Sequence, residues 1–227
     1  MKSRNEAKVR RMWTEVRRRA VVGAVTLAGI LALSIAIDAV TRSHPADAGA
    51  VLGAGSRLWL TGKSTMHDYQ SAASEWKVEM KPRTGFSEPT DAAAAAKLVR
   101  ESGVDRLEVT VPVAKLRSEK DGLDKNLQKA LKADKFPNID VTLDHYDVTQ
   151  IGDSLGITAK GEITVAGRKQ PLELTAVARP TPEGLRVTGQ KPLLMTSFDV
   201  KPPKMMMGTI KTKDEVVIHF DLLLAPR

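Results

Sequence analysis

Three residues near position 65 carry the side chains of a hydrolytic triad: Ser64, His67 and Asp68. Known triads join residues from separate segments and are recognised by geometry, whereas these three share one short stretch. Ser64 also lacks the Gly-x-Ser-x-Gly elbow of hydrolases. Serine and aspartate favour turns, because their side chains hydrogen-bond to nearby backbone. We therefore expect these residues in a turn, and a periplasmic hydrolase stays as the less favoured alternative.

The histidines and methionines could bind a metal ion, but their spacing argues against it. His44, His67, His145 and His219 lie far apart, so a zinc site would need ligands converging from distant segments. The run 205–207 offers three soft thioether ligands for copper, and methionine is equally suited to packing in an apolar pocket. We expect no metal site, no cofactor and no catalytic residue.

The charge of the chain is concentrated at its beginning. The net charge over 227 residues is +8, and residues 1–48 hold nine Lys or Arg against four Asp or Glu. The remaining residues therefore carry only +3, without aromatic residues interleaved among basic ones, so nucleic acid is not an expected partner. Cysteine is absent from the sequence, which rules out disulfides and thiolate metal sites.

Residues 1–48 resemble an export signal or a membrane anchor. Five arginines between Arg10 and Arg19 precede an uncharged apolar run over residues 20–37. Such a run is just long enough to span a bilayer, while the small residues of 46–48 offer a cleavage site. Clustered arginines stay on the cytoplasmic side, so we expect a periplasmic or secreted domain over 49–227. Residues 20–37 anchor that domain to the inner membrane if they are not cleaved.

After residue 55 the sequence alternates between apolar and polar residues, which predicts strands with one buried face. The predicted strands are Leu58–Lys63, Glu75–Met80, Arg106–Val113, Ile139–Tyr146, Leu155–Val165, Leu172–Ala178, Leu185–Met195 and Val216–Leu224. Short turns between them favour antiparallel pairing, because parallel strands need long crossovers. A closed barrel is the favoured arrangement, since closure removes exposed sheet edges.

Two helices are predicted among the strands. Leu123, Leu127 and Leu131 recur every four residues between Lys120 and Lys135, which indicates a short helix that braces the barrel. A weaker pattern over 91–101 contains five consecutive alanines and predicts a second helix. This second pattern lies in an Ala-rich stretch, 87–103, whose role the sequence leaves open.

Four segments of the chain resemble the YceI-like polyisoprenoid-binding proteins, which are exported bacterial barrels of lipocalin-like shape. They are Leu58–Tyr69, with a Ser and a following His after an aromatic strand; Leu123–Ile139, a helix leaving through Phe-Pro-x-Ile; Gly161–Leu172, a Gly-x-Leu-Thr-x-x-Gly type of hairpin; and Met195–Pro203. The resemblance covers about residues 56–225. The chain departs from the common form at Lys120-Asp121, where an Arg-Asp pair is usual, and at Asp199, where a Gly is usual.

The resemblance implies an all-β, eight-stranded antiparallel lipocalin-like barrel with one short α-helix inserted. It also implies an elongated apolar interior that holds an isoprenoid, such as a quinone tail or another long-chain lipid. The function expected is sequestration or transport of that lipid outside the cytoplasm, without catalysis. The alternative is a membrane-tethered structural or protein-interaction barrel with a filled interior. The expected partners are the lipid, the membrane and, as an alternative, a second copy of the chain in a homodimer.

The expected ligand-binding residues are those on the apolar faces of the predicted strands. They are Trp59, Trp76, Val78, Leu107, Val109, Leu143, His145, Ile163, Leu174, Met195, Phe198, Phe220 and Leu222. His145 falls on the apolar face of its strand and is expected to be buried near the barrel mouth. Ser64, His67 and Asp68 are expected close to the mouth, and His219 is expected to face solvent.

Overall fold

A computed structural model of the chain describes residues 51–205 and 210–225, which belong to one compact unit, Ala48–Arg227. The main strands are β2 (Arg57–Ser64), β3 (Asp68–Ala73), β4 (Lys77–Pro82), β5 (Val104–Pro112), β7 (Asn138–Ile151), β8 (Ser154–Val165), β9 (Arg168–Thr181), β10 (Gly184–Leu194) and β12 (Ile210–Ala225). The short strands are β1 (Val51–Leu52), β6 (Leu116–Arg117) and β11 (Lys204–Met205). The helices are α2 (Ala92–Arg100), α3 (Asp121–Ala130) and the 3₁₀ turns η1 (Val113–Lys115) and η2 (Met195–Phe198).

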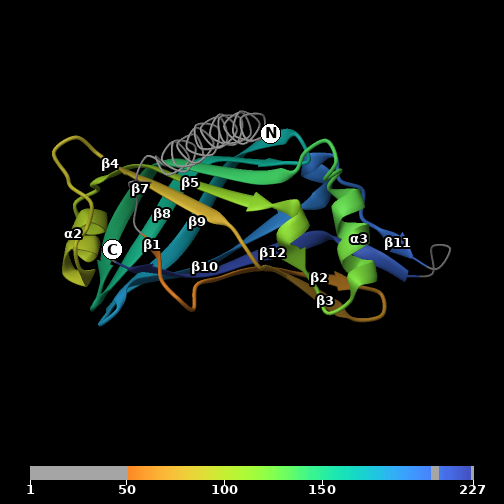
Figure 1. Ribbon diagram of the computed structural model, residues 1–227, viewed down its shortest axis with the longest axis horizontal. Helices are drawn as coiled ribbons and strands as arrows, with labels where there is room; N and C mark the ends of the chain where they lie inside the picture. The colour runs from red at the N-terminus through yellow and green to blue at the C-terminus, as the bar shows by residue number, and fades with distance from the viewer. Residues whose placement is uncertain (1–50, 206–209, 226–227) are drawn as a thin grey trace, which may run out of the picture. The chain divides into compact units, whose positions relative to one another are not determined.

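All these strands join one antiparallel sheet that curls strongly about its own interior (Figure 1). The order is β4-β5-β7-β8-β9-β10-β12-β2-β3-β6, with β1 and β11 pairing to β12 beside this path. Tight turns join the long strands; at the β8–β9 turn Ala166 and Gly167 both have positive φ, 49° and 79°. Two positive φ values match the twist of the strands that flank a two-residue turn.

The sheet is not a closed eight-stranded barrel, which corrects the sequence-based prediction. Ten strands lie along the path, and no ladder joins β4 to β3 or β6 within the described residues. Only three residues connect β3 to β4, so the end of β3 lies within about 14 Å of the start of β4. At the start of this connection the Ser74 N–H donates to Lys115 O, over 2.8 Å, and not to β4. The antiparallel, mostly β architecture is confirmed.

The two helices lie at opposite ends of the curled sheet (Figure 1). In α2 the side chain of Asp91 caps the helix by accepting from Ala94 N, over 2.7 Å. Its buried face contains Ala95, Ala96 and Val99, which pack in a cluster with Leu155 and other residues of the sheet. The weaker helix prediction over 91–101 is therefore confirmed, and the Ala-rich stretch covers one end of the interior.

Helix α3 is shorter than predicted. The pattern over 120–135 predicts about four turns, whereas the helix ends at Ala130 and turns continue to residue 135. Lys132 has a φ of 54°, in the left-handed region that stops a helix. Leu127 and Leu131 still pack on the core beneath the sheet, as their spacing indicates.

The predicted N-terminal segment lies outside the described residues. This applies to the basic cluster, the apolar run 20–37 and His44. Within residues 51–205 and 210–225 no helix combines the length and the apolar character needed to cross a membrane.

Candidate functional site

The interior of the curled sheet contains a cavity of about 250 Å³, here called cavity 1. Its wall comes from β2, β4, β5, β6, β7, β8, β9, β10 and β12, together with Trp76 before β4 and Val99 of α2. Apart from two tryptophans, only Asp105, Lys191 and Tyr146 among its lining residues carry polar side chains. Cavity 1 is therefore a space that favours hydrocarbon over water.

A second cavity of about 290 Å³, here called cavity 2, adjoins the first. Five residues line both cavities: Leu60, Ile139, Ile163, Leu193 and Ile218. Helix α3, β3 and η2 complete its wall, and polar side chains are more frequent there than in cavity 1. The interior thus runs from an apolar end near α2 to a more polar end near α3.

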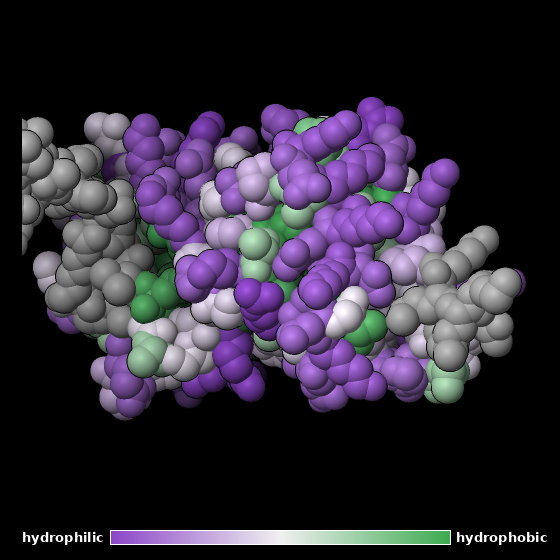
Figure 2. All heavy atoms as spheres, turned by 45° about the vertical axis from the view of Figure 1, so that its right-hand side comes forward, coloured by the Kyte–Doolittle hydropathy of each residue, from purple (hydrophilic) through white to green (hydrophobic). Residues whose placement is uncertain are grey.

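The structure brings most of the residues expected in the pocket together. Those lining cavity 1 from strands are Val78, Leu107, Val109, Leu143, Ile163, Leu174, Phe220 and Leu222, and Trp76 lines it from the connection between β3 and β4. Met195 and Phe198 lie in η2 and line cavity 2 instead. The face seen in Figure 2 differs from this lining: hydrophilic residues dominate it, and hydrophobic ones show only in small areas between them.

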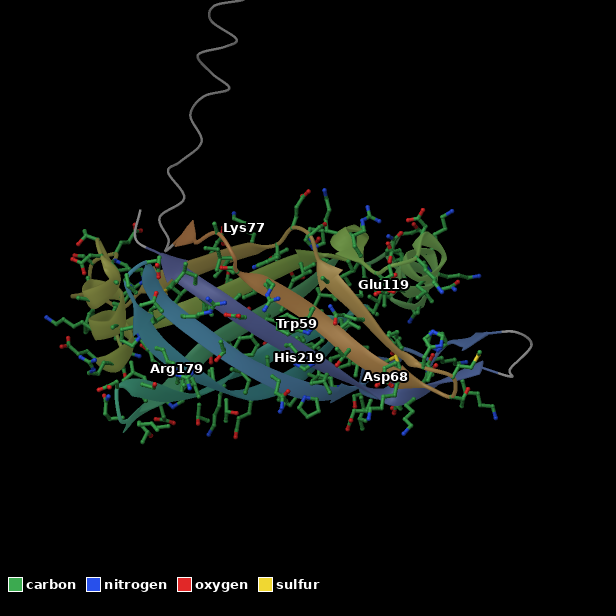
Figure 3. All side chains as sticks on the ribbon, turned by 90° about the horizontal axis from the view of Figure 1, so that it is seen from below. Trp59, Asp68, Lys77, Glu119, Arg179 and His219 are labelled. Carbon is green, nitrogen blue, oxygen red and sulfur yellow. The ribbon has the colours of Figure 1, made fainter. Side chains whose placement is uncertain are left out.

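Trp59 is placed differently from the expectation. It is paired with His219 across β2 and β12, and the two rings stack with centroids 5.1 Å apart (Figure 3). Partners in register share a face of the sheet, and their neighbour Phe220 lines the cavity, so the Trp59 ring lies on the outer face. The alternation of β2 in fact turns Leu58 and Leu60 inward. Trp59 is among the residues that line cavity 1 because β2 forms part of the wall. Its ring packs under Arg57 on the outer face.

His145 is also misplaced by the sequence pattern. Its side chain is 63% exposed and lies 3.8 Å from an Asp147 carboxylate oxygen. The register of β7 against β8 shifts between Leu143 and His145, so one extra residue enters β7 as a bulge. A bulge reverses the alternation of all later residues. Tyr146 therefore occupies the inward position, where its hydroxyl accepts a hydrogen bond from Val104 N over 3.1 Å.

Ser64 and its neighbours form the turn between β2 and β3. The Ser64 hydroxyl donates to the main-chain oxygen of His67, over 2.8 Å, and accepts from the N–H groups of Met66 and His67. Ser64 and His67 line cavity 2, whereas Asp68 is exposed beside them (Figure 3). The Ser64 hydroxyl is therefore occupied by local backbone. Of the methionine run, Met205 belongs to β11, and residues 206 and 207 lie outside the described part of the chain.

Two buried polar atoms have no hydrogen-bond partner among the described residues: the Ser71 hydroxyl and the Trp76 indole N–H. Ser71 is 3% exposed and lines cavity 2, and Trp76 lines cavity 1. A buried polar group without a partner costs about 1–3 kcal/mol, so such groups are rare. The sequence does not single out Ser71, because β3 is too short and too polar to show a clear alternation.

Asp124 is a buried carboxylate beside cavity 2. It is 3% exposed, and it accepts from the N–H and the hydroxyl of Ser118, over 2.7 and 2.6 Å. The Ser118 hydroxyl bond, assisted by the nearby Arg117, holds the pKa of Asp124 below its ordinary value despite its burial. These bonds fix the start of α3 against the strand β6. Around either cavity no three metal-ligating side chains gather among the described residues.

Comparisons with known proteins agree with this architecture. In BcnA from Burkholderia cenocepacia, the match covers 74% of this chain and 96% of that one, with 15% identity and a TM-score of 0.55. A polyisoprenoid-binding domain from Saccharophagus degradans, implicated in plant cell wall breakdown, is 12% identical and covers 77% and 97%, with a TM-score of 0.54. The YCEI protein of Campylobacter jejuni is 15% identical and covers 69% and 84%, at 0.50.

At these identities the solved structures show a shared fold and nothing further. A search of curated proteins found no relative that matches this chain. A family model, in contrast, matches residues 54–224, which include almost the whole curled sheet and both helices. The chain therefore belongs to the family of YceI-like domain proteins.

Proposed function

We propose that the domain binds an isoprenoid or a similar long-chain lipid in cavities 1 and 2, and that it sequesters or carries this lipid without chemical change. The observation that carries the proposal is the nearly unbroken apolar lining of cavity 1 and its continuity with cavity 2. A polyisoprenoid-binding domain among the similar structures supports the same ligand class. Burial of the lipid's apolar surface, at about 25 cal/mol per Å² before ordering losses, supplies the affinity.

The sizes of the cavities indicate how much lipid they hold. A cavity of about 150 Å³ takes up one benzene ring, which has six carbons. Cavities of about 250 and 290 Å³ therefore hold roughly two isoprene units each. We expect affinity to rise with chain length up to about four isoprene units and then to level off.

Native mass spectrometry of residues 49–227, purified from a bacterial host, tests the proposal. The solved BcnA chain consists almost entirely of the matching domain, so a domain of this extent folds by itself. We expect a bound lipid that organic extraction identifies as a prenyl compound or a quinone. A ligand-free domain that also fails to take up added isoprenoids would instead favour the structural or protein-interaction module.

We further propose that residues 20–37 direct the domain to the outer side of the cytoplasmic membrane. The support is the arginine cluster that precedes this apolar run. Alkaline phosphatase, which folds only outside the cytoplasm, reports the location when it is fused after residue 48. We expect an active fusion, and an inactive one would contradict the proposal.

A further inference from the structure

Ser71 presents an unused hydrogen-bonding group inside the proposed binding space. In the register of β2 and β3 it pairs with Leu60, which lines both cavities, so Ser71 faces the interior. Its hydroxyl is buried and has no partner among the described residues. Folding a free hydroxyl into an apolar wall is unfavourable, which suggests that a bound molecule supplies the missing partner.

Tyr69 lies two residues earlier on the same face of β3. It pairs with Gly62 across β2 and β3. A Cβ built on Gly62 would lie only 2.3 Å from the Tyr69 ring, so the ring occupies the space that a side chain at position 62 would need. The Tyr69 phenol is uncharged at neutral pH, because tyrosine ordinarily has a pKa of about 10 and burial raises the pKa of Tyr69 further. Tyr69 and Ser71, whose Cα atoms are about 7 Å apart along the strand, thus offer two neutral hydroxyls in the wall of cavity 2.

The charges around cavity 2 disfavour an anionic occupant. The Asp124 carboxylate is buried there and is held ionised by Ser118 and Arg117. The basic side chains of the lining, Lys120 and His67, are both exposed at the edge. An anion brought into the buried part would leave water without a buried cation to pair with it, which is costly.

We propose that Ser71 and Tyr69 form a subsite for the uncharged, oxygen-bearing head of the lipid, a hydroxyl or a carbonyl, with its hydrocarbon tail directed into cavity 1. This inference rests on the proposed function. It adds the orientation of the ligand and selects neutral isoprenoid alcohols and quinone-like compounds over diphosphates.

The test compares three probes with the same carbon skeleton: farnesol, farnesyl diphosphate and the headless hydrocarbon farnesane. Residues 49–227 with Trp59→Phe retain Trp76 as their one tryptophan, in the wall of cavity 1, so its fluorescence reports binding. We expect farnesol to bind at least about tenfold more tightly than the diphosphate. Ser71→Ala should weaken farnesol binding by about 3- to 10-fold, as expected for one hydrogen bond, and leave farnesane unchanged.

Ser74→Ala is the matched control, because it removes an exposed hydroxyl just beyond β3 that bonds to Lys115 O and lies outside both cavities. The Tm of the ligand-free protein provides a second readout. Ser71→Ala should not lower it, since the hydroxyl bonds to no protein atom among the described residues. Tighter binding of the diphosphate than of farnesol, or unchanged farnesol binding in Ser71→Ala, would overturn the subsite and leave the proposed function standing. Failure of all three probes to bind would instead overturn the proposed function.

Discussion

A phenyl group placed inside cavity 1 should weaken lipid binding at least about tenfold without unfolding the domain. Ala159 is suited to this change, because it is 4% exposed and lines cavity 1 from β8. Its strand partner Leu174 lines the same wall. In Ala159→Phe the added ring projects from the wall into the cavity.

The magnitude follows from the volumes. A phenyl group needs about as much space as the cavity of about 150 Å³ that binds benzene, so roughly 100 Å³ of cavity 1 remains, which is too little for one isoprene unit. At about 0.8 kcal/mol for each buried CH₂, the loss of one five-carbon unit removes several kcal/mol of gross burial energy. Ordering costs offset part of this amount, so we expect at least a tenfold loss of affinity.

Farnesol titrations monitored through Trp76 in the Trp59→Phe background measure this loss. Thr175→Phe is the matched control, because Thr175 is exposed and alternates with cavity-lining residues of β9. We expect the control to bind as the parent does, and both variants to unfold cooperatively in urea. If folded Ala159→Phe binds farnesol within twofold of the parent, the ligand does not occupy cavity 1 and the reasoning fails.

Three further changes test the fold around the cavities. Gly161→Ala should lower the free energy of unfolding by about 2–4 kcal/mol in urea titrations, because its Cβ would lie 1.9 Å from Thr142 O at the bulge. In the control Gly156→Ala the Cβ meets mainly the flexible end of Ile151, so the free energy of unfolding should fall by less than about 1 kcal/mol. Since Asp124 has a lowered pKa in the folded state, its contribution is present above the unfolded pKa of about 4 and is lost as pH falls through the lower folded value; Asp124→Asn should reduce stability at pH 7 and flatten this acid dependence in thermal melts. Asp199 has a φ of 55°, so Asp199→Val should destabilise by about 1–2 kcal/mol, while Asp199→Gly should stay within about 1 kcal/mol in the same urea assay; equal effects would contradict the role given to this backbone conformation.

The sequence predicts strands well where one face is buried along an uninterrupted period of two. The alternation over β5 and β12 places Leu107, Val109, Phe220 and Leu222 on the interior, as the structure does. The same reasoning fails at His145, where a bulge adds one residue to β7. The sequence of β7 alone does not predict this bulge, because the bulge depends on the pairing of β7 with Gly161 of β8. The missing side chain of Gly161 allows the close approach of Thr142 O.

The prediction for Trp59 fails for a related reason. Trp59 stands between Leu58 and Leu60, so no alternation of apolar and polar residues shows which face of the sheet its side chain takes. Its outward position depends on a partner far along the chain, His219, which also bonds to Thr61 Oγ1 over 2.9 Å. At Asp199, in contrast, the sequence comparison agrees with the local backbone conformation. The family resemblance places a Gly there, and the structure keeps the left-handed backbone that Gly favours, with Asp199 paired to Arg168.

The missing ladder between β4 and β3 or β6 in the described part of the chain explains why the alternation of residues did not predict the number of strands in the sheet. Alternation reports a buried face, but it does not report whether the edge of a strand meets another ladder. Between β3 and β4 the chain crosses from the next-to-last strand of the sheet order to the first, and Trp76 packs against the core at this crossing. No ladder is formed there among the described residues, so the Trp76 side chain lines cavity 1 without a pair of bonded strands behind it. The width of the interior at Trp76 is therefore set by packing, which a bound hydrocarbon can alter at lower cost than it could break a strand pair.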